Sequence, residues 1–185
     1  MPSFDRPTNA AIPPSPWIVR FSALIKQGGC VLDVAAGHGR HAWMLHGAGF
    51  QVVAVDIDIS GLEYLENKPK IEIMAADLES THWPLEGRLF DGIVVTNYLY
   101  RPHFPQLISA LNHGGVLIFE TFGAGNEYFG RPRNPNFLMK PGELLNLLTP
   151  HLHIVAYEHG EETTPRPSVR QRICAVKGDG PYVLP

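Results

Sequence analysis

An apolar run from Cys30 to Val34 leads directly into a turn that contains Gly37 and Gly39, and a helical pattern from Arg40 to His46 follows. Because glycine has no side chain, the backbone N–H groups of such a turn can approach a polar or anionic ligand closely. A strand that ends in this turn and continues into a helix opens many ligand-binding α/β sheets. The stretch therefore predicts an α/β fold with a ligand at the carboxyl end of its first strand.

Apolar strand runs and amphipathic helical segments alternate along most of the chain. Strands are expected at 30–34, 52–56, 71–74, 90–96 and 116–121, and helices at 16–25, 40–46, 60–66, 104–111 and 142–148. This alternation predicts a parallel sheet with helices on both faces, and right-handed crossovers place every strand-to-helix turn on one edge. The last two apolar runs, 153–157 and 169–176, have no helix between them, so we expect them to pair antiparallel.

Length and composition favour a single domain, residues 17–185, preceded by a proline-rich arm, residues 1–16, because 185 residues with 44% apolar content suit one core. A net charge of -3 and a pI near 6.3 predict no broad basic surface, so nucleic acid is an unlikely partner. The chain has no apolar stretch of membrane-spanning length and no secretory pattern at its N-terminus. Cys30 and Cys174 are expected to be buried free thiols, which favours the cytoplasm.

Nine histidines raise the question of a metal ion, but their spacing matches no common ligand pattern, so no metal site is expected. The glycine turn itself fits two kinds of cofactor. Gly37, Gly39 and Ala42 satisfy a dinucleotide-binding template, with Asp56 nineteen positions after Gly37. The cofactor must therefore be decided by other residues.

Two further carboxylates distinguish the cofactors. Asp33 lies four residues before Gly37, where it would repel a pyrophosphate but suit the charged amino acid part of S-adenosylmethionine. Asp77 follows the third strand, where it could accept a hydrogen bond from an adenine amino group. Each aspartate could alternatively cap a helix. Asp33, Asp56 and Asp77 at three successive strand ends together favour S-adenosylmethionine.

With these residues the sequence resembles the class I S-adenosylmethionine-dependent methyltransferases over residues 30–176. Within this class it is most similar to the small, single-domain enzymes of the tellurite-resistance type. The resemblance implies a Rossmann-like, mostly parallel seven-stranded sheet of order 3-2-1-4-5-7-6 with an antiparallel final strand. It implies S-adenosylmethionine as the cofactor, bound by Asp33, Ala35, Gly37, Gly39, Asp56, Ile57, Asp77, Leu78 and Asn97. The sequence departs from the family at Ala35, where the fuller pattern has glycine.

The acceptor of the methyl group is expected over the carboxyl ends of the fourth and fifth strands. Asn97 and Tyr98 follow the fourth strand, and Tyr98 either covers the sulfonium with its ring or packs as an ordinary aromatic residue. Glu120 ends the fifth strand and is a candidate base on position alone. Arg131, in the long loop 123–141, either recognises an anionic acceptor or pairs with a nearby glutamate. These four residues form the expected catalytic set.

Three functions are compatible with this pattern. The leading hypothesis is methyl transfer to a small molecule, because the chain has no strong basic surface. A non-catalytic cofactor-binding module would have the region around Asn97, Glu120 and Arg131 filled by side chains. An RNA methyltransferase would present a basic face with salt-sensitive RNA binding, formed by Arg131, Arg133, Arg166, Arg170 and Arg172.

Overall fold

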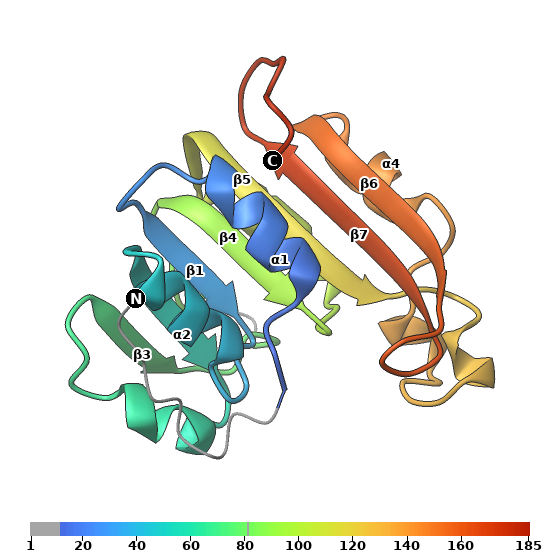
Figure 1. Cartoon of the computed structure of the whole chain (residues 1–185), viewed down its shortest axis with the longest axis horizontal. Helices are drawn as coiled ribbons and strands as arrows, with labels where there is room; N and C mark the ends of the chain where they lie inside the picture. The colour runs from blue at the N-terminus through green and yellow to red at the C-terminus, as the bar shows by residue number, and fades with distance from the viewer. Residues whose placement is uncertain (1–11, 81) are drawn as a thin grey trace.

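The computed structural model describes residues 12–80 and 82–185, and its strands form one seven-stranded sheet of order β3-β2-β1-β4-β5-β7-β6 (Figure 1). The strands are β1 (Cys30–Val34), β2 (Gln51–Asp56), β3 (Ile71–Ala75), β4 (Phe90–Thr96), β5 (Leu111–Phe122), β6 (His153–Glu162) and β7 (Ser168–Val176). Strands β1 to β5 run parallel, and β7 lies antiparallel between β5 and β6. The expected sheet order and antiparallel final strand are confirmed.

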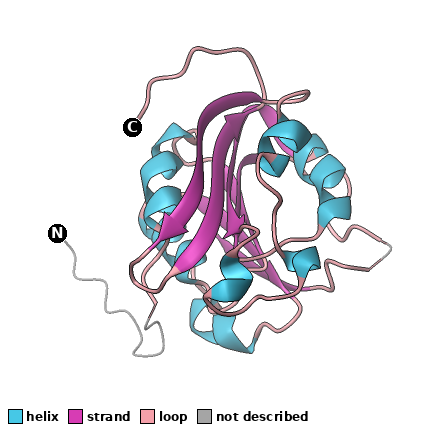
Figure 2. Ribbon diagram, turned by 90° about the vertical axis from the view of Figure 1, so that its right-hand side faces the viewer, coloured by secondary structure: helices cyan, strands magenta, loops and turns pink. Residues whose placement is uncertain are grey.

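Helices cover both faces of this sheet (Figure 2). They are α1 (Pro16–Phe21), α2 (Arg40–Gly47), α3 (Phe104–Ser109) and α4 (Glu143–Leu148). The side chains of successive strand residues alternate between the faces, so Val31 packs on the α1 and α2 side while Leu32 packs on the α3 and α4 side. Two apolar clusters result, one on each face, and both strand faces are buried as the continuous apolar runs predict.

Helix α1 begins as the sequence predicts, with Pro16 in its first turn and the Ser15 side chain accepting hydrogen bonds from the N–H groups of Trp17 and Ile18. It ends at Phe21 rather than continuing to Ile25, because the chain tightens into a 3₁₀ turn over residues 22–24. The remainder of the expected arm, residues 1–11, lies outside the described residues.

The segment Ser60–Leu65 is a 3₁₀ helix, whereas the sequence predicted an α-helix. Its backbone bonds span three residues, as from Leu62 N–H to the Ile59 carbonyl. The Asp58 carboxylate fixes its start by accepting from Ser60 N–H, and Asn67 follows with a left-handed φ of 62°. Too few residues remain between these two turns for a regular α-helix.

Other boundaries also differ from expectation. Helix α3 ends at Ser109 because Leu111 already pairs with Phe90 as the first residue of β5. Strand β6 continues to Glu162, since its ladder with β7 extends to the pair Glu162 and Ser168. Helix α2 gains one residue, Gly47. The long β6–β7 hairpin lies beside the loop 123–141, at the carboxyl ends of the parallel strands (Figure 1).

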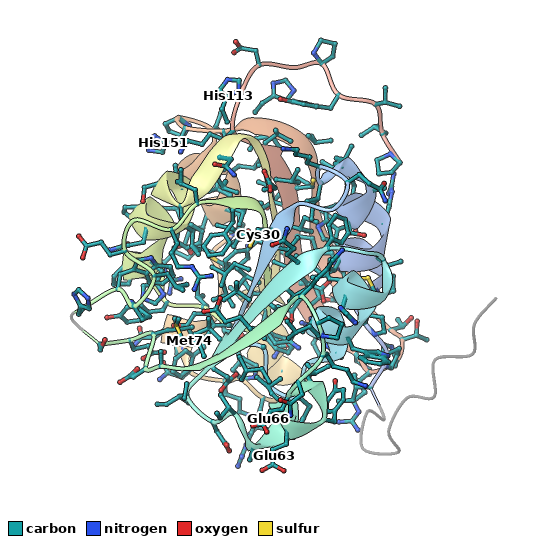
Figure 3. All side chains as sticks on the ribbon, turned by 90° about the vertical axis from the view of Figure 1, so that its left-hand side faces the viewer. Cys30, Glu63, Glu66, Met74, His113 and His151 are labelled. Carbon is teal, nitrogen blue, oxygen red and sulfur yellow. The ribbon has the colours of Figure 1, made fainter. Side chains whose placement is uncertain are left out.

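Figure 3 shows the sheet from its β3 edge, with Met74 on that strand. Glu63 and Glu66 lie at the carboxyl end of the sheet, and His113 and His151 lie at the opposite end. Cys174 is buried and Cys30 is half-buried, and both are free thiols as predicted. Among the described residues, no helix is long and apolar enough to span a bilayer.

Candidate functional site

The turn after β1 is held in left-handed backbone conformations. The φ angles are 52° at Ala35, 55° at Gly37 and 69° at Gly39. A side chain costs about 1–2 kcal/mol in this region, which explains the glycines and makes Ala35 a strained position. A Cβ atom on Gly37 would meet nothing within 4 Å, so the turn faces open space where a ligand could lie.

Gly39 serves packing instead. A Cβ atom there would approach the side chains of Leu62 and Leu65 to 2.8 Å. Gly61 is a third glycine at this place, because its Cβ would lie 2.4 Å from the His38 ring. The turn and the 3₁₀ segment can therefore touch only because glycine occupies both sides, a role for Gly61 that the sequence analysis missed.

Asp56 ties the end of β2 to the turn after β1. One carboxylate oxygen accepts from Gly37 N–H at 2.7 Å, and the other accepts from Asp58 N–H at 3.0 Å. The neighbouring Ile57 side chain is 71% exposed, which is unusual for an isoleucine beside a polar turn. The structure thus brings Gly37, Asp56 and Ile57 together at the carboxyl ends of β1 and β2.

Asp33 lies beneath the turn. Its carboxylate is buried and accepts from Ala42 N–H at 2.9 Å, which caps the first turn of α2. Burial raises the pKa of Asp33 to about 7, and the hydrogen bond from Ala42 opposes this effect only in part. Position in the sequence did not reveal the capping role of Asp33, because the direction of its side chain depends on how α2 packs against β1.

His41 links the segment before α1 to the sheet. Its Nε2 accepts from Ser15 N–H at 3.1 Å, and its Nδ1 lies 3.3 Å from the Thr96 hydroxyl. Burial lowers the pKa of His41 to about 3, so the ring is neutral, carries its proton on Nδ1 and donates to Thr96. We had not selected His41 or Thr96 as site residues. The polar residue Thr96 at the end of β4 could have indicated this pair, because the carboxyl end of β4 lies next to the first turn of α2, where His41 is located.

The Glu120 carboxylate contacts a serine hydroxyl and two arginine side chains. It accepts from the Ser15 hydroxyl at 2.6 Å and from Arg172 Nε at 3.0 Å, and Arg170 lies 3.8 Å away. The group is buried on the α1 face of the sheet. A base needs a carboxylate that is free to take a proton from the acceptor, so this geometry does not support the expectation for Glu120, which rested on position alone.

Asn97 occupies the end of β4 in a left-handed conformation, with φ 56°. Its N–H donates to the Glu120 carbonyl at 2.9 Å, and its side-chain oxygen accepts from Arg170. The Arg170 guanidinium also lies 3.8 Å above the Phe122 ring. Arg170 is therefore a residue that fixes Asn97 and that the sequence analysis assigned only to an RNA-binding face.

A pocket of about 250 Å³ opens between the ends of β4 and β5 and the long loop. Its lining includes Glu79, Asn97, Tyr98, Phe122, Pro132 and Phe137. The Tyr98 hydroxyl is buried without a hydrogen-bond partner among the described residues, and burial raises its pKa. The space beside Asn97 is therefore not filled by side chains. A larger cavity, of about 480 Å³, lies between residues 82–89 and 106–110 and does not include any of the expected site residues.

The remaining expected residues are spread around this edge. Asp77 is exposed and accepts from Glu79 N–H, while the Leu78 side chain is buried in the core. Arg131 is exposed, and within the described part of the chain it makes no salt bridge. Arg101 pairs with Glu143 instead of facing an acceptor.

The basic face that an RNA-binding protein would present is only partly formed. Arg170 and Arg172 lie in salt bridges with Glu120 and Glu162 and are largely buried. Their charges are neutralised locally because β5 and β6 bring Glu120 and Glu162 to the same face as these two β7 arginines. Only Arg131, Arg133 and Arg166 of the expected five are exposed.

Comparison with known proteins agrees with this geometry. Residues 31–115 match the family model of a methyltransferase domain. TehB from Haemophilus influenzae superimposes with a TM-score of 0.70 at 19% identity, covering 84% of this chain and 60% of that chain. An S-adenosylmethionine-dependent methyltransferase from Methanosarcina mazei gives a TM-score of 0.69 at 18% identity, covering 91% and 100% of the two chains.

Two curated relatives carry the description tRNA U34 carboxymethyltransferase. The protein of Methylococcus capsulatus is 27% identical over 140 residues, which are 64% of this chain and 43% of the relative. The protein of Alcanivorax borkumensis is 34% identical over 105 residues, which are 51% of this chain and 33% of the relative. The matches thus span less than half the length of these relatives.

The sheet order and the glycine turn agree with the fold of the class I S-adenosylmethionine-dependent methyltransferases that the sequence resembles, and residues 31–115 match the methyltransferase domain model. S-adenosylmethionine is the cofactor of this class of domain. TehB and a TehB-like S-adenosylmethionine-dependent methyltransferase of Corynebacterium glutamicum share the fold.

Proposed function

We propose that this chain transfers the methyl group of S-adenosylmethionine to a small-molecule acceptor held at the ends of β4 and β5. The observation that supports this proposal is the open pocket of about 250 Å³ beside Asn97 and Tyr98. A binding module without catalysis would have no use for such a space next to the cofactor turn. The pocket is smaller than the roughly 300–1,000 Å³ typical of sites for drug-sized ligands, which favours a small acceptor.

The turn after β1 fits the cofactor. The open space over Gly37 suits the methionine part, with the backbone of Ala35, Gly37 and Gly39 around it. Each Asp56 oxygen accepts one backbone N–H and keeps a second lone pair for a ribose hydroxyl. The exposed Ile57 side chain offers an apolar surface for the adenine ring.

The other expected cofactor residues act from the same edge. We assign Asp77 and the Leu78 backbone to the adenine rim, where Asp77 is exposed. Asp33 acts from below by fixing the first turn of α2, and a nearby ammonium group of the cofactor would favour its charged form.

When bound, S-adenosylmethionine supplies a methyl group on a positively charged sulfur, so the chain's residues need only align the acceptor and exclude water. Asn97 is held at the boundary between the cofactor turn and the pocket, and its side-chain N–H₂ remains available to orient an acceptor. Glu120 is a positioning residue, since it holds Arg170 and Arg170 holds Asn97. Arg131 stands beside the pocket-lining Pro132 as a rim residue.

The test is transfer of labelled methyl from S-adenosylmethionine to a metabolite extract, with identification of the product by mass. Phe137→Ala removes a pocket wall and should raise KM for the product-forming acceptor at least several-fold. Phe129→Ala is the matched control, because Phe129 is similarly exposed on the same loop but does not line the pocket. If the wild-type chain binds S-adenosylmethionine but labels no compound in any extract, the chain is a binding module instead.

RNA is a second candidate acceptor, and the observation that favours it is the description of the two curated relatives as tRNA U34 carboxymethyltransferases. The exposed arginines Arg131, Arg133 and Arg166 would supply the phosphate contacts. Nuclease treatment of the extract separates the two candidates: labelled product that survives the treatment supports a small molecule, and labelled RNA that disappears with it supports the second candidate.

We also place the protein in the cytoplasm. The two free thiols, Cys30 and Cys174, support this, since unpaired cysteines are typical of reducing compartments. The finding that no helix in the described part spans a bilayer agrees with this placement.

A further inference from the structure

The acceptor pocket has a distinct chemical character. Three aromatic residues, Tyr98, Phe122 and Phe137, contribute to its lining. Of the residues that the structure describes, Glu79 is the one charged residue in this lining. Among residues 12–80 and 82–185, the structure gives the Glu79 carboxylate no hydrogen bond and no salt bridge. The pocket thus combines flat apolar walls with one uncompensated negative charge.

The negative charge of Glu79 acts on the Tyr98 hydroxyl. The hydroxyl is buried with no hydrogen-bond partner among the described residues. A buried hydroxyl without a partner destabilises a folded chain, so such a group is rare unless a ligand completes it. Asp77 and Asp56 add negative charge on the same side.

A carboxylate that lines an apolar pocket and has no partner among the described residues suits a hydrogen-bond donor, because an ionised carboxylate can only accept. An N–H group that carries positive charge would satisfy Glu79 and would also lie favourably near Asp56 and Asp77. An anionic group would meet repulsion there. Arg101 and Arg170, the cations that could have offset this, are already paired with Glu143 and Glu120.

We propose that the pocket binds a small planar aromatic molecule that carries a protonated amino group, with the ring between Tyr98 and Phe137 and the amine at Glu79. This inference rests on the proposed function, because it names the class of acceptor for the same site. It runs against the alternative that Arg131 recognises an anionic acceptor.

The test uses a matched pair of probes, tryptamine and indole-3-acetate, which share the indole ring and differ in the charge of the side chain. Calorimetry is performed on the full chain saturated with S-adenosylhomocysteine. We expect tryptamine to bind at least tenfold more tightly than indole-3-acetate. Equal binding, or tighter binding of indole-3-acetate, overturns the inference. Failure of S-adenosylhomocysteine itself to bind contradicts the proposed function instead, so the two failures are distinguishable.

Two variants make the assignment specific. Glu79→Gln should weaken tryptamine binding about fivefold or more and leave S-adenosylhomocysteine binding unchanged. Glu86→Gln is the control, because Glu86 is exposed and does not line this pocket. Unchanged tryptamine affinity in Glu79→Gln overturns the assignment.

Discussion

Asp33 and His41 titrate in opposite directions beneath the glycine turn, and their effects on stability should cancel in mildly acid solution. Burial raises the pKa of Asp33 to about 7, whereas an unfolded aspartate has a pKa of 3.8. The folded state therefore binds one more proton at Asp33 between these values, and stability falls as pH rises through this range. Both groups are buried, so solvent screening is weak.

His41 has the opposite sign. Burial lowers its pKa to about 3, whereas an unfolded histidine has a pKa of 6.5. Between these values the unfolded state binds one more proton, so the contribution of His41 is complete above pH 6.5 and is lost as pH falls toward 3. Each group changes the free energy of unfolding by about 1.4 kcal/mol per pH unit, so between pH 4.5 and 6 each contributes about 2 kcal/mol with opposite sign.

Single substitutions should expose each group alone. In Asp33→Asn, the free energy of unfolding should rise from pH 4.5 to 6 by about 2 kcal/mol more than in the wild type, because His41 is unopposed. In His41→Gln, the free energy of unfolding should fall by about 2 kcal/mol relative to the wild type between pH 4.5 and 6. The glutamine amide oxygen can still accept the hydrogen bond from Ser15 N–H. Urea unfolding followed by circular dichroism measures both.

The double variant Asp33→Asn/His41→Gln is the control, and its pH dependence should return to that of the wild type. All other titrating groups are common to the four proteins and cancel in the comparison. If the two single variants show the same pH dependence as the wild type, the burial argument is wrong for both groups. If only one departs, the argument fails for the other.

Three further predictions concern the turn and the segment before α1. Ala35→Gly should raise the free energy of unfolding by about 0.5–1 kcal/mol, because relief of left-handed strain exceeds the added chain entropy, and a lower thermal midpoint would contradict this. Ser15→Ala should lower the free energy of unfolding, measured with urea, by about 2–3 kcal/mol, because it removes a helix cap and a charge-assisted hydrogen bond to Glu120. The exposed control Ser109→Ala should lower it by less than about 0.5 kcal/mol. Asp56→Ala should weaken S-adenosylmethionine binding in calorimetry by about tenfold or more, whereas Asp58→Ala should change it by less than about threefold; equal effects would remove the ribose role.

The parallel part of the sheet could be predicted from the sequence because most of its apolar runs are separated from the next by a helical segment. The resemblance then fixed the order β3-β2-β1-β4-β5-β7-β6 that the structure has. The errors fall where local segments are short. Ser60–Leu65 has apolar spacing that an α-helix and a 3₁₀ helix share, and the choice depends on the turns that flank it.

The placement of polar residues at the strand ends could be predicted only in part. Sequence position showed that Asp33, Asp56, Asn97 and Glu120 end four strands, and the structure places all four at one edge. It did not show which of them meet a partner. Asp33 meets an N–H group of α2, and Glu120 meets Arg172 from a strand fifty-two residues away. Such partners come from long-range packing, which spacing along the chain does not encode.

The alternation of side chains along the strands explains why Glu120 and Tyr98 have different roles. Ile118 belongs to the cluster on the α1 and α2 face, so Glu120 faces that side and meets Ser15. Tyr98 packs against the cluster on the α3 and α4 face, where the pocket lies. One face of the sheet edge therefore carries a polar network that fixes the backbone, and the other carries the space for an acceptor. A carboxylate that contacts the acceptor must lie on the second face. Glu79, which lines the pocket, meets this condition.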